Sequence, residues 1–222
     1  MRKSKSMRLA SGLLVVTMLS TCMISGTFAK YVTDKSASDS ARVAKFGVTV
    51  EGTADTFKKT YAKDNNSFTL AANTVVSTED VDVVAPGTGG SMAAFTITGT
   101  PEVAVNVEFK GTLELGDKWV DSTSHYYCPL EITVENETFK GKDYASADAF
   151  ETAVNEKIAE YNKNYEANTN LSTIGADAPD ISWNWAFEGN DDVKDTYLGD
   201  QAAAGNAAGI SLDVTVTVTQ ID

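Results

Sequence analysis

Histidine and cysteine are scarce in this sequence, and their scarcity excludes several classes of metalloprotein. The chain contains one histidine, His125, and two cysteines, Cys22 and Cys128. A zinc hydrolase of the HExxH type needs two histidines, and a disulfide scaffold or a cysteine-rich zinc module needs more thiols. Any metal site would therefore depend on oxygen ligands.

The common nucleotide-binding and catalytic motifs are also missing. The sequence has no GxxxxGKS/T phosphate loop, no GxGxxG turn and no GxSxG nucleophile elbow. No arrangement of serine, histidine and acidic residues stands out in their place. We therefore predict that the protein is not an enzyme and that it needs no cofactor.

Basic residues are few in the main part of the chain. Of the 18 lysines and arginines, four lie before residue 30, whereas all 31 aspartates and glutamates lie after it. Residues 30–222 thus carry 14 basic against 31 acidic side chains. Because such a surface repels phosphate backbones, we predict that the protein has no nucleic-acid partner.

The first 29 residues have the order of a secretory signal peptide. Basic MRKSKSMR is followed by an apolar run and then by the small residues of GTFA. We predict cleavage between Ala29 and Lys30 by a signal peptidase, which leaves a secreted, extracellular or cell-surface protein without a membrane span. Two alternatives stay open: an uncleaved anchor, and a lipoprotein attached through Cys22, which a lipobox-like LST precedes. After cleavage, Cys128 is the last thiol, and we expect it to be buried and inert.

Alternation of apolar and polar residues dominates the rest of the chain and predicts β-strands. At least seven short strands are expected, separated by glycine- and proline-containing turns. We therefore predict a mainly β protein in which residues 30–222 form one antiparallel β-sandwich or jelly-roll domain. The expected strands cover residues 43–50, 67–71, 81–84, 92–98, 103–109, 130–134, 181–187 and 210–218.

One segment has the periodicity of a helix instead. Apolar residues from Ala147 to Tyr165 recur at spacings of three and four, and Ser146 can cap the start. We predict an inserted amphipathic helix over residues 146–165 that lies across one end of the sandwich. A second short helix is expected over residues 191–198, with Gly199 as its C-cap.

The segment from Lys30 to Val50 follows the predicted cleavage site directly. A polar lead precedes a strand in which Phe46, Val48 and Val50 share one face. Cleavage would free this strand either to complete its own sheet or to add to the sheet edge of a neighbouring molecule.

Two further groups of residues are candidate binding sites. Asn190, Asp191, Asp192 and Asp195 offer closely spaced oxygen ligands that would suit calcium, although the preferred interpretation is a solvated loop that caps the following helix. Trp183 and Trp185 lie on one face of a strand, where they could form a ligand platform or belong to the core.

The N-terminal region resembles that of the TasA/camelysin family of exported proteins from Gram-positive bacteria. The similarity rests on Gly26-Thr27-Phe28-Ala29, on Tyr31 and the polar residues after it, and on a later Pro86-Gly87 turn before the strand Phe95-Thr96-Ile97. It implies a jelly roll and assembly into biofilm-matrix fibres with further copies and other matrix proteins, in which residues 30–50 are donated to the next subunit. The sequence departs from the family at Thr98-Gly99-Thr100 and over residues 183–222.

The sequence therefore leaves two functions in competition. The first is a structural subunit of extracellular fibres, and the second is a monomeric binding or adhesion module at the cell surface. An acidic loop and a tryptophan pair would be the working surface of the second, whereas the first requires self-association through residues 30–50.

Overall fold

The computed structural model describes residues 41–52, 56–62, 73–92, 95–174, 178–187 and 191–221. The chain divides into two compact units, Met1–Arg42 and Val43–Asp222. Only Ala41 and Arg42 of the first unit are among the described residues, so the description below concerns the second. The predicted cleavage site, Ala29 and Lys30, and the expected strand 67–71 lie outside the described residues.

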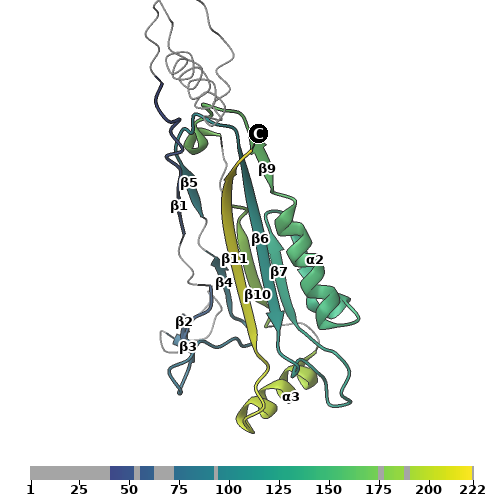
Figure 1. Ribbon diagram of the computed structural model, residues 1–222. Helices are drawn as coiled ribbons and strands as arrows, with labels where there is room; N and C mark the ends of the chain where they lie inside the picture. The colour runs from purple at the N-terminus through teal and green to yellow at the C-terminus, as the bar shows by residue number, and fades with distance from the viewer. Residues whose placement is uncertain are drawn as a thin grey trace, which may run out of the picture. The chain divides into compact units, whose positions relative to one another are not determined.

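The second unit is mainly β-structure, with two α-helices (Figure 1). The strands are β1 Thr49–Glu51, β2 Thr60–Ala62, β3 Asn73–Val76, β4 Gly89–Met92, β5 Thr96–Thr98, β6 Val105–Leu115, β7 Leu130–Val134, β8 Glu137–Lys140, β9 Lys163–Tyr165, β10 Ile181–Trp185 and β11 Ile210–Gln220. The helices are α2 Ala147–Ala159 and α3 Asp192–Ala203, with short 3-10 turns η1 Gly141–Asp143 and η2 Leu171–Thr173.

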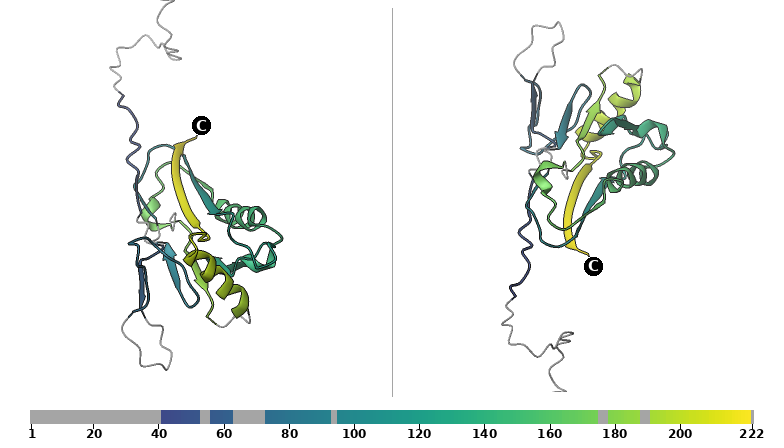
Figure 2. Two further views of the ribbon diagram at one scale, coloured as in Figure 1. Left: turned by 90° about the horizontal axis from the view of Figure 1, so that it is seen from below. Right: turned by 90° about the horizontal axis from the view of Figure 1, so that it is seen from above.

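All the strand pairs within the described ranges are antiparallel, and they form four sheets. The two larger ones have the strand orders β4-β10-β7-β8 and β11-β6-β9, and the two smaller ones pair β1 with β5 and β2 with β3. In the end-on views, α2 lies on one side of the β11–β6 pair and strands β1 to β5 lie on the other (Figure 2). The prediction of a mainly β, antiparallel chain is confirmed at this level.

One apolar core joins the two larger sheets. Every second residue of β6, β7 and β10 is buried, as period-two alternation predicts for strands with one face in a core. Side chains from both sheets belong to a single cluster. The fully buried members of the cluster include Val105, Val107, Leu130, Ile132 and Val134 from the strands and Phe150, Val154 and Ile158 from α2.

The inserted helix begins where the sequence predicts and ends earlier. Ser146 caps α2 by accepting a hydrogen bond from the amide of Ala149 at 3.2 Å. The helix stops at Ala159 rather than at Tyr165, and Lys163–Tyr165 forms strand β9 on β6. A β-ladder with β6 thus replaces helical hydrogen bonds that periodicity alone had suggested. The helix also lies along β6, and not across one end as expected.

Several other expected boundaries were wrong. The first strand is Thr49–Glu51 instead of 43–50, and α3 continues through Gly199 to Ala203. Good helix formers follow Gly199, and the left-handed residue that ends the helix region is Gly205, with φ +81°. Residues 81–84 form no strand, and Val83 makes one isolated bridge to Lys58. None of the helices in the described ranges has the length and apolar character that a membrane crossing requires.

Candidate functional site

The longest free sheet edge in the described part of the chain belongs to β11. This strand pairs with β6 over all eleven of its residues, from Ile210 opposite Leu115 to Gln220 opposite Val105. Among the described residues, no strand pairs with its other side. The ladder has no bulge, so the edge is regular over its whole length.

The backbone groups that β11 turns outward can be identified from β6. The amides of Phe109, Leu113 and Leu115 point away from β11, because they donate to two side chains of α2 and to Asn162 in the segment that follows it. Opposed antiparallel residues point their backbone groups either toward each other or both away. The partners of these three, Val216, Leu212 and Ile210, therefore direct their N–H and C=O groups to the open side.

The side chains of β11 alternate between a face that packs on the core and a face that is exposed to solvent. Val214, Val216 and Val218 face the core and are only half-buried, whereas Thr215 and Thr217 on the other face are exposed. Natural edge strands are usually blunted by lysine, proline or a bulge. Residues 210–220 contain no lysine and no proline, and their one charged residue is Asp213. The edge can therefore accept another strand through both backbone hydrogen bonds and apolar contacts.

A groove of about 1060 Å³ adjoins the start of β11. One wall comes from the β2–β3 arm and residues 81–86, and the other from α3 and the following segment. Small residues make up much of the second wall, so few side chains fill the space: Gly199, Ala202, Ala203, Ala207, Ala208 and Gly209. Trp119 and Trp185, both nearly fully buried, line the groove as well.

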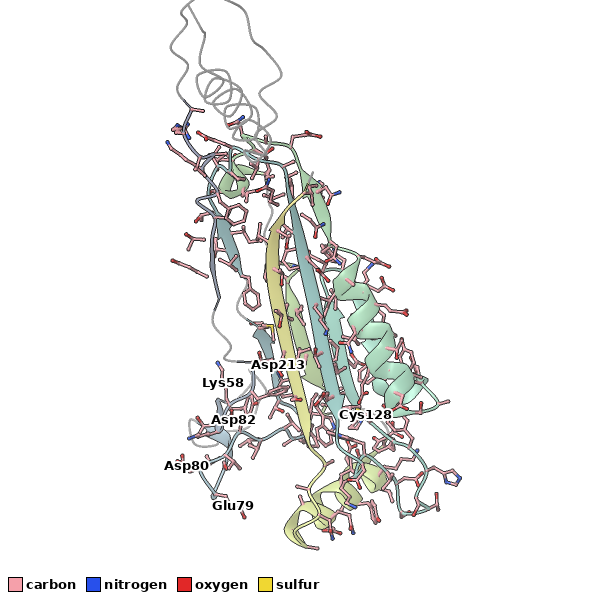
Figure 3. The ribbon with its side chains drawn as sticks, viewed as in Figure 1. Lys58, Glu79, Asp80, Asp82, Cys128 and Asp213 are labelled. Carbon is pink, nitrogen blue, oxygen red and sulfur yellow. The ribbon has the colours of Figure 1, made fainter. Side chains whose placement is uncertain are left out.

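The groove has an acidic rim. Glu79 and Asp82 lie on the arm, and Asp213 lies on β11, all three exposed to solvent. Figure 3 shows Glu79, Asp80 and Asp82 together with Lys58 on the arm. Two lysines, Lys58 and Lys59, also line the groove. The charge of Lys59 is neutralised by a salt bridge from its Nζ to Asp80 Oδ1 at 2.9 Å. The rim would therefore favour a cationic occupant.

A buried hydroxyl group also borders this groove. Thr56 is 5% exposed, and its Oγ1 has no hydrogen-bond partner among the described residues. Its carbonyl oxygen accepts a hydrogen bond from Trp183 Nε1 at 2.8 Å. Buried polar groups are normally hydrogen-bonded, so this hydroxyl is a buried polar group beside the groove that could bond an occupant.

The predicted assembly residues lie in a segment that its own sheet covers only in part. Phe46 is 40% exposed and Val50 is 38% exposed, whereas Val48 packs against the core. Gly47 has φ +47°, which breaks the extended geometry that would have kept the three residues on one face. Lys45 holds the segment to Glu102 through both of its backbone groups, at 2.8 and 3.0 Å.

The two tryptophans proposed as a ligand platform belong to the core. Trp183 is 3% exposed and Trp185 is 4% exposed. Their indole nitrogens donate to Thr56 and to Asp195 Oδ2, so both polar tips are used inside the protein. Core burial, the alternative interpretation, describes both indoles, and Trp185 also lines the groove.

Two of the predicted calcium ligands have other partners in the described part of the chain. Asp195 accepts hydrogen bonds from the Tyr127 hydroxyl at 2.7 Å and from Trp185 at 3.2 Å, and Asp191 lies 3.5 Å from Lys142 Nζ. Asp192 is in the first turn of α3, and Asn190 lies outside the described residues. No set of three or more acidic, histidine or cysteine side chains in the described ranges could hold a metal ion. Asp195 instead fixes α3 to β10.

Cys128 is fully buried, as expected. Burial raises the pKa of its thiol from 9.0 to about 12, which leaves little thiolate at neutral pH. The main feature that the sequence analysis missed is the position of β11 at a free edge. The absence of lysine and proline from residues 210–220 was the available signal.

No protein-family model, no curated protein and no solved structure matches the chain.

Proposed function

We propose that this protein is an exported structural subunit that self-assembles into extracellular fibres. The N-terminal segment of one copy adds as a strand to the free edge of β11 in the next. The observation that carries the proposal is the edge itself: eleven residues paired on one side, with half-buried valines and no blunting residue. Such an edge is a template for strand addition.

Charge and exposure support residues 42–50 as the added strand, whose last two residues would exchange their pairing with β5 for the edge of the next copy. Arg42 and Lys45 are its only charged residues, whereas the groove at the start of β11 has an acidic rim. Val43, Phe46 and Val50 keep 90%, 40% and 38% of their surface exposed, so they retain apolar area to bury in an assembly. Full burial of one such side chain contributes about 1.5–3 kcal/mol.

The signal-like N-terminus and the shared core of the two larger sheets also support the proposal. The basic, apolar and small-residue order of residues 1–29 supports secretion with cleavage before Lys30, which N-terminal sequencing of the secreted protein would test. The two larger sheets share one core, and this supports a sandwich of the jelly-roll kind. The resemblance to the TasA/camelysin family supports a place in a biofilm matrix.

Sedimentation velocity and electron microscopy of the purified protein test the assembly. We expect concentration-dependent growth into fibres for the wild type. Phe46→Asp places a charge on the strand that would be buried and should leave monomers. The matched control is Thr217→Asp, which places the same charge on the exposed face of β11 and should still assemble. A wild type that stays monomeric at high concentration would remove the fibre function.

The groove favours a second candidate, a monomeric binding module. Its volume of about 1060 Å³, apolar walls and acidic rim suit an extended cationic peptide. Under this alternative the wild type is monomeric, and Phe46→Asp lowers its thermal stability without changing its oligomeric state. Binding of a lysine- and valine-containing peptide, weakened by Asp213→Asn, would then be the decisive measurement.

A further inference from the structure

The apolar residues of residues 42–50 and of β11 restrict how the two strands can lie side by side. Each has three at alternate positions: Phe46, Val48 and Val50 in the segment, and Val214, Val216 and Val218 in β11. Residues that lie beside each other in a sheet place their side chains on the same face. Full overlap of the two apolar sets leaves two arrangements. A parallel strand has Phe46 beside Val214, and an antiparallel strand has Phe46 beside Val218.

The charged residues distinguish these two arrangements. In the parallel one, Lys45 lies beside Asp213 on the exposed face, and Glu51 lies beside Thr219. In the antiparallel one, Glu51 lies beside Asp213, so that two carboxylates are neighbours, and Lys45 lies beside Thr219. Opposite charges on neighbouring strands are stabilising, whereas like charges are destabilising. Charge therefore favours the parallel arrangement.

The groove gives a second reason for the parallel direction. Residues 42–45 would then lie beside Ile210–Asp213, all four of which line the groove. The chain before them would continue past the acidic rim that contains Glu79 and Asp82. Residues 30–42 carry three basic and two acidic side chains, and cleavage before residue 30 would add a positive α-amino group. An antiparallel strand would carry this basic end away from the rim.

We infer that the strand of an incoming copy runs parallel to β11 with Lys45 beside Asp213, and that the groove receives the basic residues at the N-terminal end of this strand. The inference rests on the fibre proposal and adds its direction and register. Lys45 exchanges its two backbone hydrogen bonds with Glu102 for bonds to β11. Gly47 can take the extended geometry of the added strand because it has no Cβ atom.

Disulfide cross-linking between two single-cysteine variants tests the direction. Both variants carry Cys22→Ala and Cys128→Ala, so no native thiol remains. Thr49→Cys lies beside Thr217→Cys in the parallel arrangement and beside Thr215→Cys in the antiparallel one. The last two are matched, because both threonines are exposed on the same face of β11.

The geometry of a disulfide makes this test selective. Residues side by side on neighbouring strands have Cα atoms about 4.8 Å apart, whereas a shift of two residues increases the distance to about 8 Å. A disulfide needs Cα atoms within about 7 Å. After the two variants are mixed, assembled and oxidised in air, cross-linked dimers on a non-reducing gel should form about tenfold faster with Thr217→Cys than with Thr215→Cys.

Charge reversal provides a second measurement that needs no introduced cysteine. Asp213→Lys places two lysines side by side in the parallel arrangement, so we expect the protein concentration needed for assembly to rise about fivefold. Adding Lys45→Glu to this variant should restore assembly. The matched control, Glu108→Lys, makes the same charge change at an exposed position of β6 and should leave assembly unchanged.

Two results would overturn the inference and leave the fibre proposal intact. One is cross-linking through Thr215→Cys that is as fast as through Thr217→Cys, or faster. The other is assembly that Asp213→Lys promotes, since in the antiparallel arrangement the new lysine would lie beside Glu51. A wild type that stays monomeric in sedimentation velocity would instead remove the fibre proposal, and this inference with it.

Discussion

The indole nitrogen of Trp183 donates a buried hydrogen bond to the carbonyl oxygen of Thr56, 127 residues earlier in the chain, at 2.8 Å. The rings of Phe57 and Tyr61 lie against the same indole, at centroid distances of 5.3 and 6.0 Å. Trp183 thus joins the β2–β3 arm to β10. This attachment fixes one wall of the groove beside β11.

Replacement of Trp183 by phenylalanine should destabilise the protein. The change removes the donor and leaves the buried carbonyl of Thr56 without a partner, which costs about 1–3 kcal/mol. Urea unfolding followed by circular dichroism measures the free energy of unfolding. Phe187→Leu is the control, because Phe187 is 68% exposed and its loss should change little. Equal effects of the two substitutions would contradict the role given to this hydrogen bond.

Two glycines should respond in opposite ways to added side chains. Gly111→Val would force α2 away from β6, and overpacking of this kind costs about 1–3 kcal/mol. Gly199→Ala meets nothing within 4 Å inside α3, so it should stabilise the protein by about 0.5–1 kcal/mol. Thermal unfolding of both variants measures the two changes in stability. A stable Gly111→Val variant would show that the helix does not lie as close to the strand as described.

Proline substitutions in β11 should distinguish the amides that face β6 from the amides that face the open side of the sheet. The amide of Thr215 faces β6, so Thr215→Pro removes a ladder hydrogen bond and leaves its acceptor unpaired, which should cost about 1–3 kcal/mol. The amide of Val216 faces the open side, and proline is tolerated at such edge positions. Val216→Pro should therefore unfold at a much higher urea concentration than Thr215→Pro.

The two proline variants, Thr215→Pro and Val216→Pro, also test the proposed assembly. Under the fibre proposal, Val216→Pro removes one amide from the acceptor edge and should reduce polymer length in sedimentation velocity while the monomer stays folded. Similar instability of both proline variants would refute the assignment of outward-facing groups.

The buried thiol of Cys128 should make stability fall at alkaline pH. Its folded pKa of about 12 lies above the ordinary value of 9.0, so the folded state holds the proton that the unfolded state loses between these values. Stability therefore decreases as pH rises from 9 toward 12, by about 1 kcal/mol at pH 10.

Urea unfolding at pH 8 and pH 10 should show this loss in the wild type and a smaller one in Cys128→Ala. Burial also raises the pKa of Tyr127, but that contribution is present in both proteins and is removed by the comparison. Equal pH dependence of the two proteins would mean that the thiol is not desolvated as described. A thiol reagent at pH 8 should likewise react only after unfolding.

The sequence predicted most of the strands that form the shared core. Alternation placed Leu130–Val134 without error and gave Ile181–Trp185 and Ile210–Gln220 to within two residues. It succeeded there because one face of each strand is buried, and burial imposes a period of two on the residue types. The cap of α2 at Ser146 was predictable for a similar local reason, since its side chain satisfies a nearby amide.

The candidate site was less predictable. Trp183 and Trp185 have the same local pattern in a core as on a ligand platform, and only the residues packed on them, such as Phe57 and Trp119, decide between the two. The close spacing of oxygen ligands predicted that Asp195 binds metal, whereas its partners Tyr127 and Trp185 come from other elements that spacing does not reveal. The exposed Phe46 was likewise expected on a regular strand, which Gly47 interrupts.

By itself, the sequence determined that the chain is acidic, poor in metal-binding side chains and built mainly of alternating strands, because charge, composition and period are properties of the residues. Only the tertiary structure decided which strand has a free edge. β11 and β6 carry the same alternation, yet α2 covers one side of their pair while, among the described residues, the other side has no partner strand. That difference depends on which elements meet in space, and a pattern with a period of two contains no information about the neighbour on either side.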